Sequence, residues 1–225
     1  MLRKLFFSIV MIASVSLGIT GCWDNHHNST EPIYGSGNIV SVRRTVADCS
    51  GINIESVCDV YLVSGKEQSI TIEADDNIID QVITRKENGL LKVGLDDGEY
   101  SNVKVKAYVT LKTIQKLSIT GAGNIYIQNA FNTDNLETII NGAGNINLKG
   151  ESNYLNCVVN GAGNIVADQF IAKKVDAMVN GAGNCNVYAV NELNASIFGV
   201  GSIYYSGNPA NVKTYINGVG RIIRK

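Results

Sequence analysis

The sequence predicts an all-β fold, a right-handed parallel β-helix whose coils are about 20 residues long. Two observations predict it: the loop Gly-Ala-Gly-Asn occurs four times and Gly-Val-Gly twice more, and apolar and polar residues alternate on both sides of each loop. The loops begin at Gly121, Gly142, Gly161, Gly181, Gly199 and Gly218. Self-similarity at a short period indicates a solenoid, in which each coil packs on its neighbours. We expect the right hand because parallel crossovers almost always take it.

The strands of each coil lie on either side of the loop. Two positions before the first glycine every copy carries Ile or Val, such as Ile140 and Val159, and five positions before it a polar residue, such as Asn156. An apolar column resumes after the loop, as at Ile146. Alternation with period two predicts half-buried strands, so each coil consists of a strand, a corner, a second strand and a return of variable length.

The loops themselves are predicted to be tight corners. We expect glycine there because the corner needs either positive φ or close approach of successive coils, and a Cβ would disfavour both. The corner glycines are Gly121, Gly123, Gly142, Gly144, Gly161, Gly163, Gly181, Gly183, Gly199, Gly201, Gly218 and Gly220. The asparagines beside them are expected to form amide ladders that bond coil to coil. The ladder positions are Asn124, Asn145, Asn164 and Asn184 after the corner, and Asn141, Asn160, Asn180 and Asn217 before it.

Residues 35–116 are less regular than the repeats at 117–225, although they too are rich in predicted strands. We expect them to form irregular first coils and to cap the N-terminal edge of the β-helix. Within them, residues 74–86 are compatible with a short helix or a strand. At the other end, Arg221, Arg224 and Lys225 put charge on the last strand, a common defence against edge-to-edge association.

Residues 1–22 are predicted to be a lipoprotein signal peptide. A positive start precedes an apolar run from Leu5 to Leu17, and the following Ile19-Thr20-Gly21-Cys22 is similar to a bacterial lipobox, in which Cys22 is acylated. An ordinary secretory signal cleaved nearby is the alternative. Lipid on Cys22 would hold the protein at a membrane surface, and residues 23–34 would then be a flexible tether.

Composition argues against several functions. The net charge is −1 with acids and bases interspersed, so no nucleic-acid partner is expected. Both histidines, His26 and His27, lie in the tether, which argues against His-dependent catalysis or a His-based zinc site in the folded body. Six corners at solenoid spacing argue against a phosphate loop, and Asn in place of a regular Asp argues against bound calcium. We therefore predict no catalytic residue, no metal and no cofactor.

Two outward-facing features remain candidates for ligand contact. Glu137 and Asp176 share a column two coils apart, about 9.6 Å by strand spacing, which would suit acid–base chemistry on a sugar, although solvated carboxylates are the commoner outcome. Tyrosines on the outer surface can stack on sugars or anchor a protein partner, although an ordinary strand-forming role is commoner. These tyrosines are Tyr126, Tyr188, Tyr204, Tyr205 and Tyr215.

Four cysteines remain after Cys22. Cys157 and Cys185 fall in different inward columns, on opposite sides of the corner, and are predicted to be buried small hydrophobic residues. Cys49 and Cys58 bracket an alternating run. In an exported protein a disulfide between these two is one option, and two free thiols are the other.

Several motifs together resemble one known family. They are Gly35-Ser36-Gly37-Asn38-Ile39, Gly51-Ile52-Asn53-Ile54, Cys58-Asp59-Val60-Tyr61-Leu62, Ile72-Glu73-Ala74-Asp75-Asp76-Asn77 and the Gly-Ala-Gly-Asn-Ile repeats. From about residue 35 to 225 the chain resembles the exported bacterial family described as "putative auto-transporter adhesin, head GIN domain". The resemblance implies a right-handed β-helix similar to the pectin-lyase-like fold, without recognised catalytic residues, and a role in adhesion. Cys49 and Cys58 depart from the family's pattern, in which aromatic residues are common, so the packing there is expected to differ.

We therefore expect a non-enzymatic, lipid-anchored protein of the cell envelope, by default at the outer membrane, with an adhesive or structural role. Its partners would be the membrane, through the N-terminal lipid, and a glycan or surface protein, through an extended face. One alternative is a carbohydrate-active β-helix enzyme of the polysaccharide lyase or hydrolase type. The other is a periplasmic scaffold that self-associates through its end coils.

Overall fold

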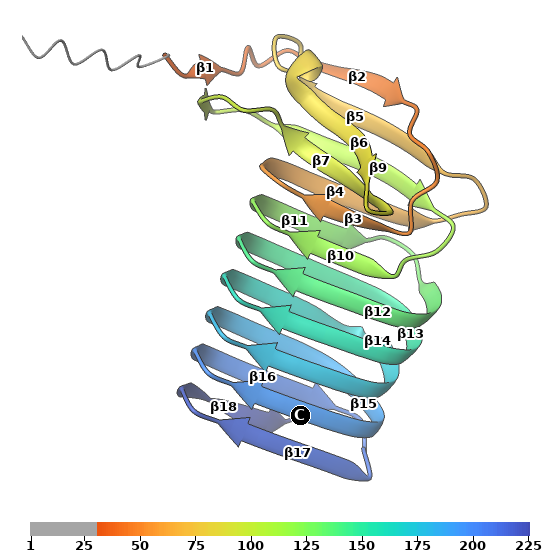
Figure 1. The fold of residues 1–225 in the computed structure, drawn as a ribbon, viewed down its shortest axis with the longest axis vertical. Helices are drawn as coiled ribbons and strands as arrows, with labels where there is room; N and C mark the ends of the chain where they lie inside the picture. Colours follow the sequence, from red (N-terminus) through yellow and green to blue (C-terminus); the bar gives the residue numbers. More distant parts are fainter. Residues whose placement is uncertain (1–30) are drawn as a thin grey trace, which may run out of the picture. The chain divides into compact units, whose positions relative to one another are not determined.

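The computed structural model describes residues 31–225, and residues 32–225 form one compact unit. This unit is a β-solenoid of about five turns with coils about 20 residues apart, so the predicted all-β parallel β-helix is confirmed (Figure 1). The predicted signal peptide at 1–22, its lipid-bearing Cys22 and the tether up to residue 30 lie outside the described residues. Within 31–225, no helix has the length and apolar character needed to span a membrane.

Each coil contributes one strand to each of two parallel sheets, and the glycine corner joins the two. We call the sheet whose strands run into the corners the entry sheet, and the sheet whose strands leave them the exit sheet. The entry sheet contains β3 (Gly51–Ile54), β10 (Lys116–Ile119), β12 (Phe131–Ile140), the second halves of β13 (Ala143–Val159), β14 (Ala162–Val179) and β15 (Ala182–Ile197), and β17 (Asn211–Ile216). The exit sheet contains β4 (Val57–Ser64), β11 (Ala122–Ile127), the first halves of β13, β14 and β15, β16 (Val200–Ser206) and β18 (Val219–Arg224).

The core lies between the two sheets and is built from columns of like residues. On the exit sheet Ile125 pairs with Ile146, which pairs with Ile165, and the column continues through Cys185 to Ile203. All five side chains are fully buried. Burying each isoleucine contributes about 1.5–3 kcal/mol relative to leaving it in water, so every added coil stabilises itself and both neighbours.

The corners need glycine for close approach in every coil and for positive φ in some. A Cβ placed on Gly142 would collide with the carbonyl oxygen of Gly121 in the preceding coil, and one on Gly144 would collide with that of Gly123. Gly144 also has φ +147°, which side chains disfavour. The first coil turns without this motif, and Cys58 takes the column of Gly123. A side chain fits there because β9 (Val105–Leu111) pairs with β4 only from Asp59 onward.

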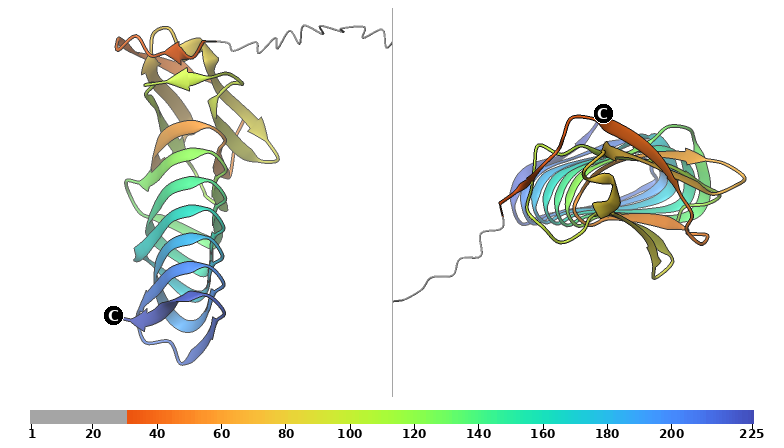
Figure 2. Two further views of the ribbon diagram at one scale, coloured as in Figure 1. Left: turned by 90° about the vertical axis from the view of Figure 1, so that its left-hand side faces the viewer. Right: turned by 90° about the horizontal axis from the view of Figure 1, so that it is seen from above.

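We expected residues 35–116 to form irregular first coils and to cap the N-terminal edge; the structure has one first coil, β3 and β4, and beyond it a cap of mostly antiparallel strands (Figure 2). On the exit side, β9 joins the first coil and is followed outward by β5 (Ser69–Asp75) and β2 (Ile39–Arg44), both antiparallel. On the entry side, β7 (Leu90–Leu95) pairs with β3 and with antiparallel β6 (Val82–Glu87). Two short strands, β1 (Ile33–Tyr34) and β8 (Tyr100–Ser101), pair beside them.

The undecided stretch at 74–86 contains the end of β5, a turn, a 3₁₀-helix η1 (Ile79–Gln81) and most of β6. The turn is tied to the motif at 35–38, which is part of the cap and not a corner of the solenoid. Asp75 is buried and accepts hydrogen bonds from the backbone N–H of Gly37 (2.8 Å) and Lys104 (3.2 Å). Asp75 is therefore a structural residue of the cap and not a solvated turn residue.

Candidate functional site

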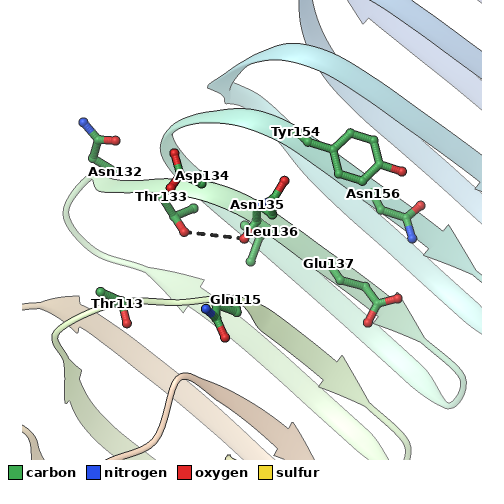
Figure 3. Close-up of a pocket in the computed structure, with 10 residues that line it drawn as sticks. All are labelled: Thr113, Gln115, Asn132, Thr133, Asp134, Asn135, Leu136, Glu137, Tyr154 and Asn156. Carbon is green, nitrogen blue, oxygen red and sulfur yellow. Dashed lines mark hydrogen bonds between the residues drawn. The ribbon is translucent and has the colours of Figure 1, made fainter.

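A hollow on the described surface lies on the entry sheet, where neighbouring strands differ in length. β12 has ten residues but β10 has four, so β10 pairs only with Glu137 to Ile140 of β12. The earlier part of β12 is left without a strand on its N-terminal side. A hollow of about 640 Å³ opens there, which we call the entry groove (Figure 3). Its lining residues are Thr113, Gln115, Asn132, Thr133, Asp134, Asn135, Leu136, Glu137, Tyr154 and Asn156.

Tyr154 is the one aromatic residue of the entry groove, and its position is fixed from two sides. Its hydroxyl donates a 2.5 Å hydrogen bond to Asp176 Oδ2, and Lys174 Nζ lies 5.9 Å from the ring centroid. Burial, followed by the hydrogen bond to Asp176, raises the pKa of Tyr154 to about 12. The protonated phenol donates to Asp176 and thereby holds the ring at the rim of the groove.

Glu137 and Asp176 lie in one outward column, joined by register through Asn156. Both carboxylates are already engaged. Glu137 Oε2 forms a 2.7 Å ion pair with Lys116 Nζ, while Asp176 accepts from Tyr154 and, at 2.6 Å, from Asn194 Nδ2. Neither of these two carboxylates is therefore free of a partner on the sheet surface.

The asparagines after the corner form a continuous ladder with a single direction. Asn145 Nδ2 donates to Asn124 Oδ1 (2.9 Å), Asn164 Nδ2 donates to Asn145 Oδ1 (2.9 Å), and Asn184 Nδ2 donates to Asn164 Oδ1 (3.0 Å). Asp59 ends the ladder in the first coil, where its Oδ1 accepts from both the backbone N–H (3.0 Å) and Nδ2 (2.8 Å) of Asn124. Each Asn of the ladder donates toward the preceding coil, so the ladder needs an acceptor at its N-terminal end. A carboxylate suits this position because a charged acceptor forms stronger hydrogen bonds than an amide.

The ladder before the corner is shorter than predicted. Asn160 Nδ2 donates to Asn141 Oδ1 (2.8 Å), and Asn180 Nδ2 donates to Asn160 Oδ1 (2.7 Å). Asn217, predicted to belong to it, makes no side-chain hydrogen bond within residues 31–225. The physical reason is Phe198, which occupies this column in the intervening coil and packs against Tyr215, with ring centroids 5.4 Å apart.

Two of the predicted outward tyrosines lie on the exit sheet at opposite ends of a second hollow, of about 320 Å³. We call it the exit hollow, and its lining residues are Tyr126, Asn145, Asn147, Asn164, Val166, Asn184, Asn186 and Tyr204. The other tyrosines lie elsewhere. Tyr215 is exposed on β17, Tyr205 packs partly against the core, and Tyr188 is half-buried.

Sequence reasoning missed three residues of the exit face, namely Asp59, Tyr61 and Tyr108. The signal for the first two was present. Cys58-Asp59-Val60-Tyr61-Leu62 alternates like Gly123-Asn124-Ile125-Tyr126-Ile127, and the structure pairs the two segments position by position. Tyr108 could not be found in this way, because it lies on a cap strand outside the repeat.

The four cysteines in the described part of the chain are all buried free thiols. The disulfide between Cys49 and Cys58 is therefore not formed. The physical reason is that β3 runs extended between them, and its four residues span about 13 Å, whereas disulfide-bonded Cα atoms lie within about 7 Å. Burial raises the pKa of the Cys58 thiol. Cys157 and Cys185 lie on different sheets but meet in the core, where hydrogen bonding to Cys157 and burial raise the pKa of Cys185.

Within residues 31–225, no group of three His, Cys, Asp or Glu side chains is arranged to hold a metal ion. The linings of the entry groove and the exit hollow consist mainly of hydrogen-bonding and aromatic side chains.

Comparison with known proteins gives one family and several similar folds. The family model described as "Putative auto-transporter adhesin, head GIN domain" matches residues 48–209. A solved structure described as a putative adhesin from Bacteroides fragilis is similar with a TM-score of 0.68 and 23% identity, covering 86% of this chain and 100% of that one. A structure from Parabacteroides distasonis described as a putative lipid binding protein has a TM-score of 0.55 and 21% identity, covering 87% and 100%. No curated protein matches the chain.

Proposed function

We propose, from the premise that this chain belongs to the putative auto-transporter adhesin, head GIN domain family, that it is a non-enzymatic envelope protein with an adhesin-like role. Lipid on Cys22 would hold it at a membrane, and residues 23–34 would connect the lipid to the β-helix. In this proposal the β-helix presents a polar surface to a glycan or to a surface protein of another cell.

The entry groove is the observation that carries this proposal. It offers amide and hydroxyl groups from β12, from β13 and from the segment just before β10, together with one fixed aromatic ring, Tyr154. Binding sites for polar ligands commonly combine an aromatic platform with a few placed hydrogen-bonding groups. Both of its carboxylates have partners, which favours binding over catalysis: Glu137 is paired with Lys116, and Asp134 Oδ1 accepts a 2.8 Å hydrogen bond from Asn153 Nδ2.

A glycan array probed with the full-length protein tests the proposal. We expect binding without product formation, and we expect Asn135→Ala and Tyr154→Ala to weaken it by tenfold or more. Lys213→Ala, on the same sheet but outside the groove, is the matched control and should bind normally. Release of shortened oligosaccharides that is lost in Glu137→Gln would overturn the non-enzymatic proposal and favour a carbohydrate-active enzyme.

The lipid anchor is tested separately from binding. Labelling of growing cells with radioactive palmitate should mark the wild-type protein and not Cys22→Ser, and the variant should leave the membrane fraction. Digestion of intact cells with protease then reports whether the β-helix faces the outside. An unlabelled wild-type protein would mean that the segment at 1–22 is an ordinary secretory signal.

A further inference from the structure

The exit face carries a column of aromatic rings that ends abruptly. By register, Tyr108 pairs with Tyr61, and Tyr61 pairs with Tyr126. The ring centroids are 5.2 Å and 5.3 Å apart, with interplanar angles of 16° and 24°. Because these spacings are close to the distance between paired strands, the ring planes lie roughly across the long axis of the solenoid. One face of Tyr126 is therefore covered by Tyr61, and the other faces the next coil.

The next three coils carry short side chains in this column, so the aromatic column is interrupted. Tyr126 pairs with Asn147, Asn147 with Val166, Val166 with Asn186, and Asn186 with Tyr204. Four strand spacings separate the two tyrosines, about 19 Å along the solenoid. The exit hollow is the space left by these short side chains, and an aromatic ring closes it at either end.

Tyr204 resembles Tyr126 in having one face covered and one open. Lys225 follows β18, the strand on the C-terminal side of Tyr204, and its Nζ lies 5.6 Å from the ring centroid. The remaining face of Tyr204 is directed toward Asn186 and the hollow. Tyr61 thus lies on the outer side of Tyr126, and Ile223 and Lys225 lie on the outer side of Tyr204, whereas the inner sides of the two rings border the hollow beside Asn147 and Asn186.

The floor of the exit hollow is polar, uncharged and partly unused. The ladder residues Asn145, Asn164 and Asn184 bond mainly to one another. The side-chain amides of Asn147 and Asn186, by contrast, make no hydrogen bond within residues 31–225, so each offers a free donor and a free acceptor. No lining residue carries a charge.

We propose that the exit hollow is a binding site for a neutral oligosaccharide that lies along the solenoid axis. Sugar rings present apolar C–H faces that stack on aromatic rings, and hydroxyls that both donate and accept, and the hollow supplies both kinds of partner. The open faces of Tyr126 and Tyr204 take the two ends, and Asn147 and Asn186 bond to the hydroxyls between. The inference rests on the proposed binding role and assigns a ligand class to the sheet opposite the entry groove.

Substitution of Val166 tests this site by filling the hollow. Val166→Tyr fills the hollow with a ring in the same column, and tyrosine is favourable in a strand. Met178→Tyr is the matched control, because Met178 is an outward residue of the same β14 on the entry sheet. The probe is an array of neutral oligosaccharides, with uronate-containing oligosaccharides of equal length beside them.

We expect the wild type and Met178→Tyr to bind neutral oligosaccharides, and Val166→Tyr and Tyr204→Ala to bind them at least tenfold more weakly. Asn147→Ala combined with Asn186→Ala should produce a similar loss, and circular dichroism should be unchanged in each variant. The inference is wrong if Val166→Tyr binds like the wild type, or if only uronate-containing sugars bind. Neutral-sugar binding lost in Tyr154→Ala but kept in Val166→Tyr would support the entry groove and reject the exit hollow.

Discussion

At the scale of single residues, the corner glycines are required because the backbone of the preceding coil lies too close for a Cβ. Gly144→Ala should lower the free energy of unfolding by more than about 1–2 kcal/mol, because the new Cβ meets the carbonyl oxygen of Gly123 and the φ of +147° disfavours a side chain. Ala143→Ser, an exposed change in the same corner, is the control and should have little effect. Urea unfolding followed by circular dichroism measures both, and equal midpoints for the two variants would contradict the close-approach explanation.

Asp59 should matter more than its place in the irregular part of the sequence indicates. Asp59→Ala leaves two donors of Asn124 without their acceptor, and we expect a loss of about 1–3 kcal/mol in the free energy of unfolding. Asp59→Asn keeps an oxygen in place and should cost less. Chemical denaturation of the two variants at neutral pH compares them. A larger loss in Asp59→Asn than in Asp59→Ala would show that the ladder does not need this acceptor.

Tyr154 gives a pH-dependent prediction. Its folded-state pKa of about 12 lies above the value near 10 of an unfolded chain. The associated stability is therefore complete below pH 10 and is lost as the pH rises toward 12. Ultraviolet difference titration should show that the wild type has an ionisation near pH 12 that Tyr154→Phe lacks. A full tyrosine titration near pH 10 in the wild type would contradict the hydrogen bond to Asp176.

The sequence predicts correctly those residues that the repeat aligns with equivalent residues in the neighbouring coils. The columns through Ile146 and Asn145 follow from alternation alone, because a strand has only two faces and stacked coils pair like with like. Contacts across the core do not follow from it. Cys157 and Cys185 come from opposite sheets, and their meeting depends on the width of the corner, which no periodicity encodes.

At the scale of elements, the solenoid and its cap differ in the sequence separation and orientation of their paired strands. Coil strands pair with the chain about 20 residues away, so repetition predicts them. Cap strands pair across unequal distances and with both orientations, as β9 does with parallel β4 and antiparallel β5. Period-two alternation predicted these strands but carries no information about their partners. The entry groove escaped prediction for a related reason, since it depends on the shortness of β10.

Hydrogen exchange should differ between end and middle strands. β17 pairs on one side only, with β15, and all six of its residues are exposed, whereas β14 is paired on both sides. We expect amides of β17 and β18 to exchange first and those of β13 and β14 last, because opening an end coil breaks a single interface. Mass spectrometry of peptides after deuterium labelling measures this order. Faster exchange in β14 than in β17 would contradict a stack held together by nearest neighbours.

At the scale of the whole molecule, stability should be close to a sum over coils. Asn124→Ala and Asn184→Ala are three strand spacings apart, about 14 Å, and their losses in unfolding free energy should add within about 0.5 kcal/mol. Asn145→Ala and Asn164→Ala share one hydrogen bond, so the second change should cost less than the first. Urea unfolding of both double variants and their single variants completes the comparison. Equal coupling free energies in the two pairs would mean that stability is not a sum of coil terms and nearest-neighbour interfaces.

Because the amide ladder runs in one direction, further coils could be inserted into the solenoid. In the ladder from Asn124 to Asn184, each amide donates to the preceding coil, and the Oδ1 atoms of Asn124, Asn145 and Asn164 accept from the following coil, so the successive corners at Gly142 and Gly161 are interchangeable as joints. A duplicate of residues 143–161 spliced in after residue 161 would meet familiar partners on both sides. Each such duplication would lengthen the body by one strand spacing, about 4.8 Å, while the cap and the final coil stay as they are. Duplication of these nineteen residues would thus change the length of the solenoid without a change in its other coils.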